Sequence, residues 1–147
     1  MFAVAGAAPV DALTLVTKRF ASVGVFFGDR EATTGQFVRV NVANVGDPDQ
    51  APNPCAAQVR FFDDADAVVR QERFSVANGR TGSLDLTAVY VGNPDIRVQV
   101  RATVQVATAI GDPNALCRTT LEVVDVETRR TAGFYGDPEL VPAPLAQ

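Results

Sequence analysis

The stretch from residue 96 to residue 106, IRVQVRATVQV, decides the fold class. Apolar and polar residues alternate along it without a break: Ile96, Val98, Val100, Ala102, Val104 and Val106 alternate with Arg97, Gln99, Arg101, Thr103 and Gln105. A period of two places these sets on opposite faces of a β-strand. The sequence therefore predicts a long strand with one face in a core and the other in water.

The same alternation recurs along the rest of the chain. It predicts further strands at residues 20–27, 36–45, 56–62, 68–76, 83–88 and 117–126. Turn sequences separate them, namely Asn78-Gly79 and the Gly-Asp-Pro or Gly-Asn-Pro triplets at 46–48, 92–94, 111–113 and 136–138. A helix of two turns at residues 11–19 is the one helical alternative that we consider. Short strands without helices predict an all-β fold, an immunoglobulin-like antiparallel β-sandwich of seven or eight strands.

The length of 147 residues fits one domain. We divide the chain into an N-terminal extension (1–19), a β-sandwich domain (20–133) and a C-terminal tail (134–147). The formal charge of −4 gives no excess of basic residues, which argues against nucleic acid as a partner. No stretch reaches the 18 or so apolar residues of a membrane-spanning helix.

Two cysteines, Cys55 and Cys117, lie without the CxxC spacing of a metal site. Counting by two, each falls on the more apolar face of its strand, so the alternatives are a disulfide and two separate buried thiols. A disulfide between them would restrict the unfolded chain and so stabilise the fold by roughly 4 kcal/mol. In an immunoglobulin-like arrangement the two strands that follow the cysteines lie on either side of the strand at 96–106, in the same sheet. These two strands are then about 9.6 Å apart, which is too far for a disulfide unless the loop ends that carry the cysteines lean toward each other.

A set of segments between residues 35 and 131 carries a further signal, namely GQFVRVNV (35–42), PC (54–55), VRFFD (59–63), SLDL (83–86), RVQVR (97–101), Cys117, LEVVD (121–125), Thr128 and Thr131. Together these segments resemble a group of small exported bacterial proteins with one immunoglobulin-like sandwich and two cysteines. The resemblance implies an exported protein with a cysteine before the third strand and another before the last. Arg129-Arg130 and Ala77-Asn78-Gly79 depart from the Gly-Arg and Pro-Gly turns of that group. Its function is generally unassigned.

The first twelve residues, MFAVAGAAPVDA, are small and apolar, like the end of a secretory signal. They lack a charged start and a full hydrophobic run. Either a signal was trimmed here, or the protein is not exported by this route. Paired cysteines favour export, so we expect an extracellular or periplasmic location.

Candidate catalytic chemistry is sparse. The absence of histidine removes Ser-His-Asp and Cys-His constellations and histidine-ligated metals. The serines lie in no G-x-S-x-G elbow, and Lys18, the sole lysine, has no partner motif. With no tryptophan and two tyrosines, sugar-binding aromatic platforms are scarce. We expect no enzyme, no catalytic residue, no cofactor and no metal ligand.

Two polar clusters have ligand-binding alternatives. Acidic loops with Asp63, Asp64 and Asp66, or with Asp47 and Asp49, offer oxygens to calcium, although carboxylates that initiate turns explain them better. A second cluster comprises outward arginines on neighbouring strands that form either a stripe for an acidic surface or an ordinary solvated face: Arg39, Arg60, Arg97 and Arg101.

Adjacent aromatic residues predict covered surface. In each of the pairs Phe26-Phe27 and Phe61-Phe62, one ring must point away from the face that the other occupies. Exposed rings of this kind are covered by the chain's own tails or by another chain.

The function we expect is a non-catalytic extracellular structural or interaction module. Its partner is a second copy of itself, bound through strand edges and the apolar N-terminal segment, with Phe2, Val4 and Val10 as contacts, in a homo-oligomer or filament. In the competing interpretation this segment folds back on its own sandwich. The alternative function is a glycan- or calcium-binding module that uses the acidic loops.

Overall fold

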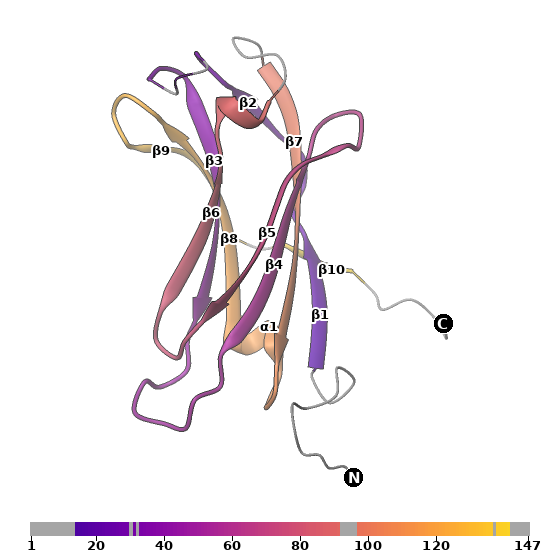
Figure 1. Ribbon diagram of the computed structural model, residues 1–147, viewed down its shortest axis with the longest axis vertical. Coiled ribbons are helices and arrows are strands. Elements are labelled where there is room, and N and C mark those ends of the chain that lie inside the picture. Colours follow the sequence, from indigo (N-terminus) through magenta and orange to yellow (C-terminus); the bar gives the residue numbers. More distant parts are fainter. Residues whose placement is uncertain (1–13, 30, 32, 92–96, 137, 142–147) are drawn as a thin grey trace.

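The computed structural model describes all residues except 1–13, 30, 32, 92–96, 137 and 142–147. Two antiparallel sheets face each other (Figure 1), which confirms the all-β antiparallel sandwich. The described residues form ten strands: β1 (Thr14–Arg19), β2 (Val23–Phe26), β3 (Gln36–Asn44), β4 (Cys55–Phe62), β5 (Val68–Val76), β6 (Thr81–Leu86), β7 (Arg97–Thr108), β8 (Cys117–Asp125), β9 (Thr131–Tyr135) and β10 (Glu139–Val141). The count exceeds the expected seven or eight because short edge strands flank the core strands. A helical turn, α1 (Pro113–Leu116), precedes β8.

The larger sheet has the strand order β10-β1-β7-β4-β5, and β2 also pairs with β7. The smaller sheet has the order β6-β3-β8-β9. Our placement of the last core strand was therefore wrong: β8 pairs with β3 in the smaller sheet, and β1 and β2 take the position beside β7. The two cysteine-bearing strands β4 and β8 lie in opposite sheets.

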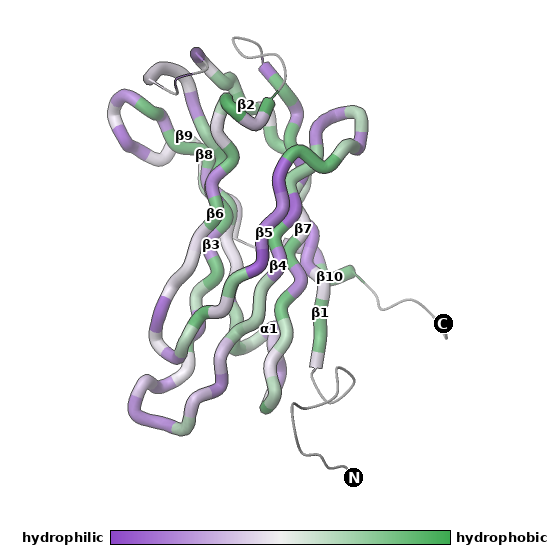
Figure 2. The backbone as a smooth tube through the Cα atoms, viewed as in Figure 1, coloured by the Kyte–Doolittle hydropathy of each residue, from purple (hydrophilic) through white to green (hydrophobic). Residues whose placement is uncertain are grey.

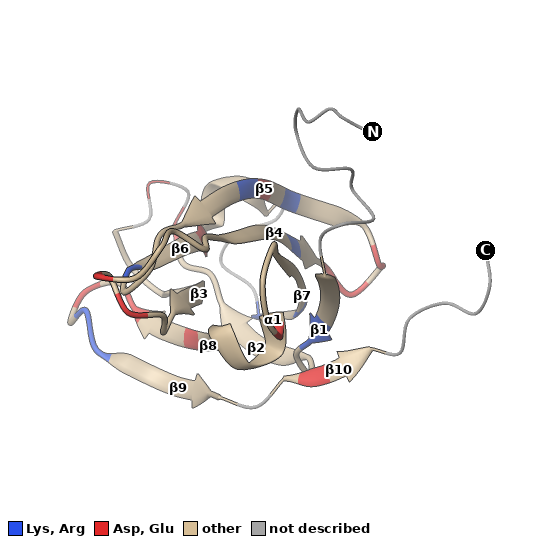
Figure 3. Ribbon diagram, turned by 90° about the horizontal axis from the view of Figure 1, so that it is seen from below, with Lys and Arg blue, Asp and Glu red and all other residues tan. Residues whose placement is uncertain are grey.

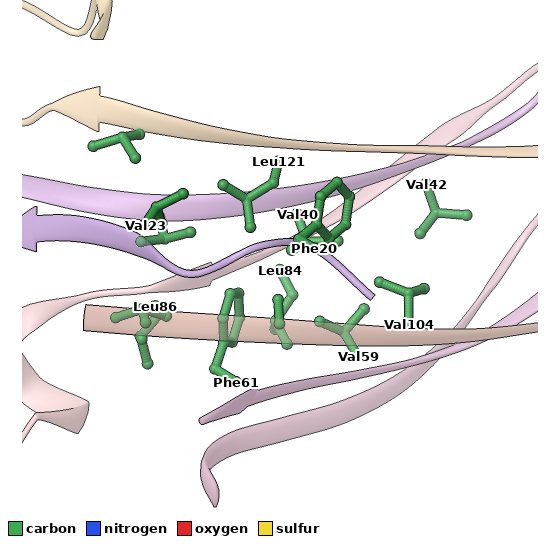
Figure 4. Packing of buried hydrophobic residues seen from close by; sticks show 14 of the residues in the cluster. Phe20, Val23, Val40, Val42, Val59, Phe61, Leu84, Leu86, Val104 and Leu121 are labelled. Atoms are coloured by element: carbon green, nitrogen blue, oxygen red, sulfur yellow. The ribbon is translucent and has the colours of Figure 1, made fainter. Parts of the chain in front are cut away.

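Alternating apolar residues fill the space between the sheets, as the period of two predicts. Hydropathy alternates along the strands (Figure 2), and the apolar side chains from the two sheets meet in one cluster (Figure 4). Val104 and Val59 of the larger sheet and Val40 and Leu121 of the smaller one are fully buried. Burying a side chain of this size stabilises the fold by about 1.5–3 kcal/mol.

β1 and β2 are two parts of one segment that pairs with β7 and is interrupted by a bulge. Arg19 pairs with Thr103 and Val23 with Val100, so four steps along this segment match three along β7. The extra residue reverses which positions face inward. Lys18 is buried before the bulge and Val25 after it.

The sandwich extends beyond the limits we drew for it. Residues 14–19, assigned to the extension and considered as a helix, form the strand β1, which pairs with β7. The predicted C-terminal tail contributes the end of β9, which pairs with β8, and the whole of β10, which pairs with β1. Figure 3 shows β9 and β10 following each other along one side of the sandwich, so this segment crosses from the smaller sheet to the larger one.

A disulfide joins the two sheets at one end. Cys55 and Cys117, the first residues of β4 and β8, have Cα atoms 5.9 Å apart. The predicted bond is present, but it bridges the sheets rather than spanning two strand spacings in one sheet. Beside it, the buried Asn44 side chain donates to the carbonyl oxygens of Asn53 and Val76, each at 3.0 Å, and accepts from the Gly46 amide at 2.9 Å. These bonds satisfy a polar group that would otherwise be costly to bury.

Removing the disulfide should destabilise the fold without changing its topology. Because the cysteines are 62 residues apart, we expect the double variant Cys55→Ala/Cys117→Ala to lose up to about 4 kcal/mol of unfolding free energy, measured by urea denaturation. Wild-type protein reduced before denaturation is the matched control and should lose a similar amount. Two free thiols per unreduced, unfolded chain would contradict the bond.

Candidate functional site

A polar cleft lies on the side of the sandwich that β9 and β10 follow (Figure 3). We call it the Lys18 cleft. It has a volume of about 460 Å³. Lys18 of β1 and Thr119 of β8 contribute from opposite sheets, α1 contributes Asn114, and the connection from β9 to β10 contributes Pro138. The cleft therefore lies between the two sheets, near the connection from β9 to β10.

Lys18 is the only lysine of the chain, and it points inward. Its side chain is 3% exposed, and its Nζ donates a hydrogen bond of 2.7 Å to the carbonyl oxygen of Cys117. Burial lowers the pKa of Lys18 to about 8, and the nearby Arg118 acts in the same direction while Asp112 opposes it. A cation thus lies inside the sandwich with a main-chain oxygen as its acceptor.

Thr119 adds a second polar group without a partner. Its side chain is 3% exposed, and among the described residues nothing accepts from or donates to its hydroxyl. Lys18 retains two further N–H donors beyond its bond to Cys117. Within the described part of the chain, no carboxylate forms an ion pair with Lys18. The cleft can therefore donate several hydrogen bonds to a bound acceptor.

Sequence reasoning missed this cleft because it looked for motifs around Lys18 and found none. A usable signal was present in the alternation of Val16, Lys18 and Phe20, which share one face of β1. Val16 and Phe20 are apolar, so the same period of two that identified the core strands places the lysine toward the core.

The predicted arginine stripe is only partly assembled. Arg60, Arg97 and Arg101 lie on the outer face of the larger sheet, whereas Arg39 lies on β3 of the smaller sheet. Arg39 forms a two-point ion pair with Asp85, at 2.7 and 3.0 Å. Arg101 pairs with Asp66 and stacks 4.5 Å from the Phe62 ring, and the Arg60 Nε donates to Gln71 at 3.0 Å. These contacts are typical of a solvated sheet face.

A shallow apolar hollow lies on the same outer face, beside the start of β1. We call it the alanine hollow. It has a volume of about 500 Å³ and is lined by, among others, Leu15, Ala56, Phe74, Ser75 and Ala107. Leu15 is 57% exposed. Small side chains on three neighbouring strands leave this space unfilled.

The acidic loops use their carboxylates in turns. Asp63 accepts from the amides of Ala65 and Ala67 at 2.9 and 3.0 Å, and Asp47 accepts from the amide of Asp49 at 2.8 Å. Carboxylates that bond the amides two or more residues ahead stabilise turns. Across the residues that the structure describes, no group of three or more acidic or cysteine side chains has a metal-binding arrangement.

The aromatic pairs divide as the sequence predicts. Phe27 and Phe61 are fully buried, whereas Phe26 is 47% exposed and Phe62 lies under Arg101 on the outer face. The predicted self-association residues Phe2, Val4 and Val10 lie outside the described residues.

No protein-family model matches the chain, and comparison with curated proteins identifies no relative. Among its described helices, none is long and apolar enough to cross a membrane.

The buried Lys18 predicts a rise of stability with pH. In the folded protein its pKa is about 8 against an ordinary value of 10.5, so between these values the unfolded chain binds the extra proton and the unfolding free energy increases with pH. We expect this increase in urea denaturation from about pH 7 to about pH 9.5, and its loss in Lys18→Met, which keeps the length of the side chain. Parallel pH profiles of the two proteins would contradict the lowered pKa.

Proposed function

We propose that the protein is a non-catalytic interaction module that associates with copies of itself in an extracellular or periplasmic space. The alanine hollow carries the proposal, because it is an exposed apolar surface next to the point where the apolar N-terminal segment joins the sandwich. In this proposal residues 1–12 of one copy bind in the alanine hollow of a second copy. Each copy then donates one segment and offers one hollow.

Composition supports this pairing of segment and hollow. Residues 1–12 contain Phe2, Val4 and Val10 among small apolar residues, and Asp11 is their only charged side chain. The hollow offers apolar and small side chains, and Arg73 is the charged residue that lines it. An apolar segment with one acidic residue thus complements an apolar surface with one basic residue.

The direction of the chain favours a second copy over a fold-back onto the same sandwich. Thr14 pairs with Thr108, the last residue of β7, and the chain runs from there along β1 into the sheet. A fold-back into its own hollow requires a turn between Pro9 and Thr14, and residues 10–13 contain neither glycine nor proline. Twelve extended residues reach about 40 Å, enough to contact a neighbour.

The disulfide supports the proposed compartment. The bond between Cys55 and Cys117 supports a location outside the reducing cytoplasm. The pairs β3–β6 and β4–β7 support an immunoglobulin-like type, because they match the B–E and C–F pairs of the immunoglobulin sheets. The pair β3–β8 departs from that type, in which the last strand lies beside the F strand. The glycan- or calcium-binding alternative finds less support, because the acidic loops already use their carboxylates in turns.

Deletion of residues 1–12 tests the donation. We expect the full chain to elute as a species larger than one chain in size-exclusion chromatography with light scattering, and the deleted chain to be monomeric. Ser75→Arg in the full chain places a charged, bulky side chain in the hollow and should also give a monomer. Ser83→Arg is the matched control, since Ser83 is likewise exposed but lies on β6 of the other sheet.

Three results would overturn the proposal. The first is a monomeric full chain, which shows that no association occurs; if deletion of residues 1–12 then lowers the melting temperature, the segment folds back on its own sandwich. The second is association that survives the deletion, and the third is association that Ser83→Arg disrupts as strongly as Ser75→Arg. Either result places the interface elsewhere.

A further inference from the structure

We propose that the Lys18 cleft is a binding site for a small carboxylate. The proposal does not depend on self-association, because the cleft lies between the edges of the two sheets and the alanine hollow lies on the outer face of the larger one. It concerns a ligand with one carboxylate and a body about the size of a sugar acid or an amino acid.

The first argument is the set of unused donors. Lys18 and Thr119 come from β1 and β8, in opposite sheets, and both line the cleft. The Thr119 hydroxyl is buried and has no hydrogen-bond partner among the described residues. An unpaired buried polar group is costly, and a ligand that accepts its hydrogen bond removes that cost.

The second argument is charge. Among the described carboxylates near the buried ammonium, Asp112 accepts from the Asn114 amide at 2.9 Å as the N-cap of α1, and Glu139 of β10 pairs with Arg19 at 2.7 Å. Neither forms an ion pair with Lys18. The pairing partners of Lys18 in the sheet are the apolar Val104 and Leu140. Arg118 at the cleft carries charge of the same sign. The buried cation thus has no anion at ion-pair distance within the described part of the chain, and a bound anion would supply one.

The third argument concerns which anion fits. Lys18 is buried, whereas Arg118, which also lines the cleft, is exposed on β8, so the buried charge that a ligand would match is a single one. A carboxylate carries one charge and two acceptor oxygens, which suits the Lys18 ammonium and the Thr119 hydroxyl together. The volume of about 460 Å³ lies within the range of small-molecule sites. Pro138 and Leu140 provide an apolar wall for the rest of the ligand.

Because Lys18 is the only lysine, selective isotope labelling of lysine gives one side-chain signal for NMR titration of the full chain. The probes are acetate and glucuronate, with chloride and phosphate as comparison anions at constant ionic strength. We expect both carboxylates to shift the ε-CH₂ signal of Lys18 saturably and to raise its pKa from about 8 toward the ordinary value of 10.5. Tighter binding of glucuronate than of acetate assigns the site to sugar acids, and the reverse assigns it to small free acids.

Thr119→Val tests the second donor with little change of shape. Loss of its hydroxyl should weaken carboxylate binding about fivefold. Thr17→Val is the matched control, because Thr17 lies on β1 next to Lys18 but lines the outer face of the sheet. It should leave the affinity unchanged.

Four outcomes would overturn the proposal. They are the absence of a saturable shift, an equal shift with chloride, tighter binding of phosphate than of either carboxylate, and equal affinities of Thr119→Val and the wild type. The first two outcomes leave Lys18 with its bond to the Cys117 carbonyl alone, the third assigns the cleft to phosphate, and the fourth excludes the Thr119 hydroxyl from the site.

Discussion

Cys117 is the residue through which the two sheets are held together at one end. Its sulfur is bonded to Cys55 of β4, its carbonyl oxygen accepts from Lys18 of β1, and it pairs with Asn44 of β3. A covalent bond, a charge-assisted hydrogen bond and a β-ladder therefore meet at the first residue of β8. Because these contacts involve both sheets, they determine where β8 begins and how far apart the sheets lie at this end.

The Lys18 cleft results from the same arrangement. β8 pairs with β3 in the smaller sheet, so the position beside β7 is taken by β1 and β2. An inward side chain of β1 then faces β8 across the interior, which brings Lys18 to the Cys117 carbonyl. The bulge after β1 reverses the alternation, and beyond it the segment contributes apolar residues such as Val23 and Val25 to the core. The segment formed by β1 and β2 thus contributes Lys18 to the polar cleft and apolar side chains to the hydrophobic core.

The outer face of the larger sheet changes character along its strands. Arginines with glutamines and threonines occupy one part, where ion pairs and aromatic stacking hold several of the guanidinium groups. Near the start of β1 the side chains become small, as at Ala56 and Ala107, and the face becomes an apolar hollow. Small residues cannot fill the space above a sheet, so this part of the surface suits an added segment of chain, whereas the arginine part interacts with water.

Local sequence determined the strands and their faces. In residues 96–106 backbone geometry alone sends successive side chains to opposite sides, so the alternation identified β7 and its buried valines, and Asn78-Gly79 marked a turn in which Gly79 adopts a φ of +73°. Tertiary structure decided which strands became neighbours. Pairing partners such as Thr17 and Val141 are far apart in the sequence, and the main-chain hydrogen bonds that join them carry no information about residue type. For that reason the sheet that contains β8, the pairing of β1 with β7 and the cleft around Lys18 followed only from the folded chain.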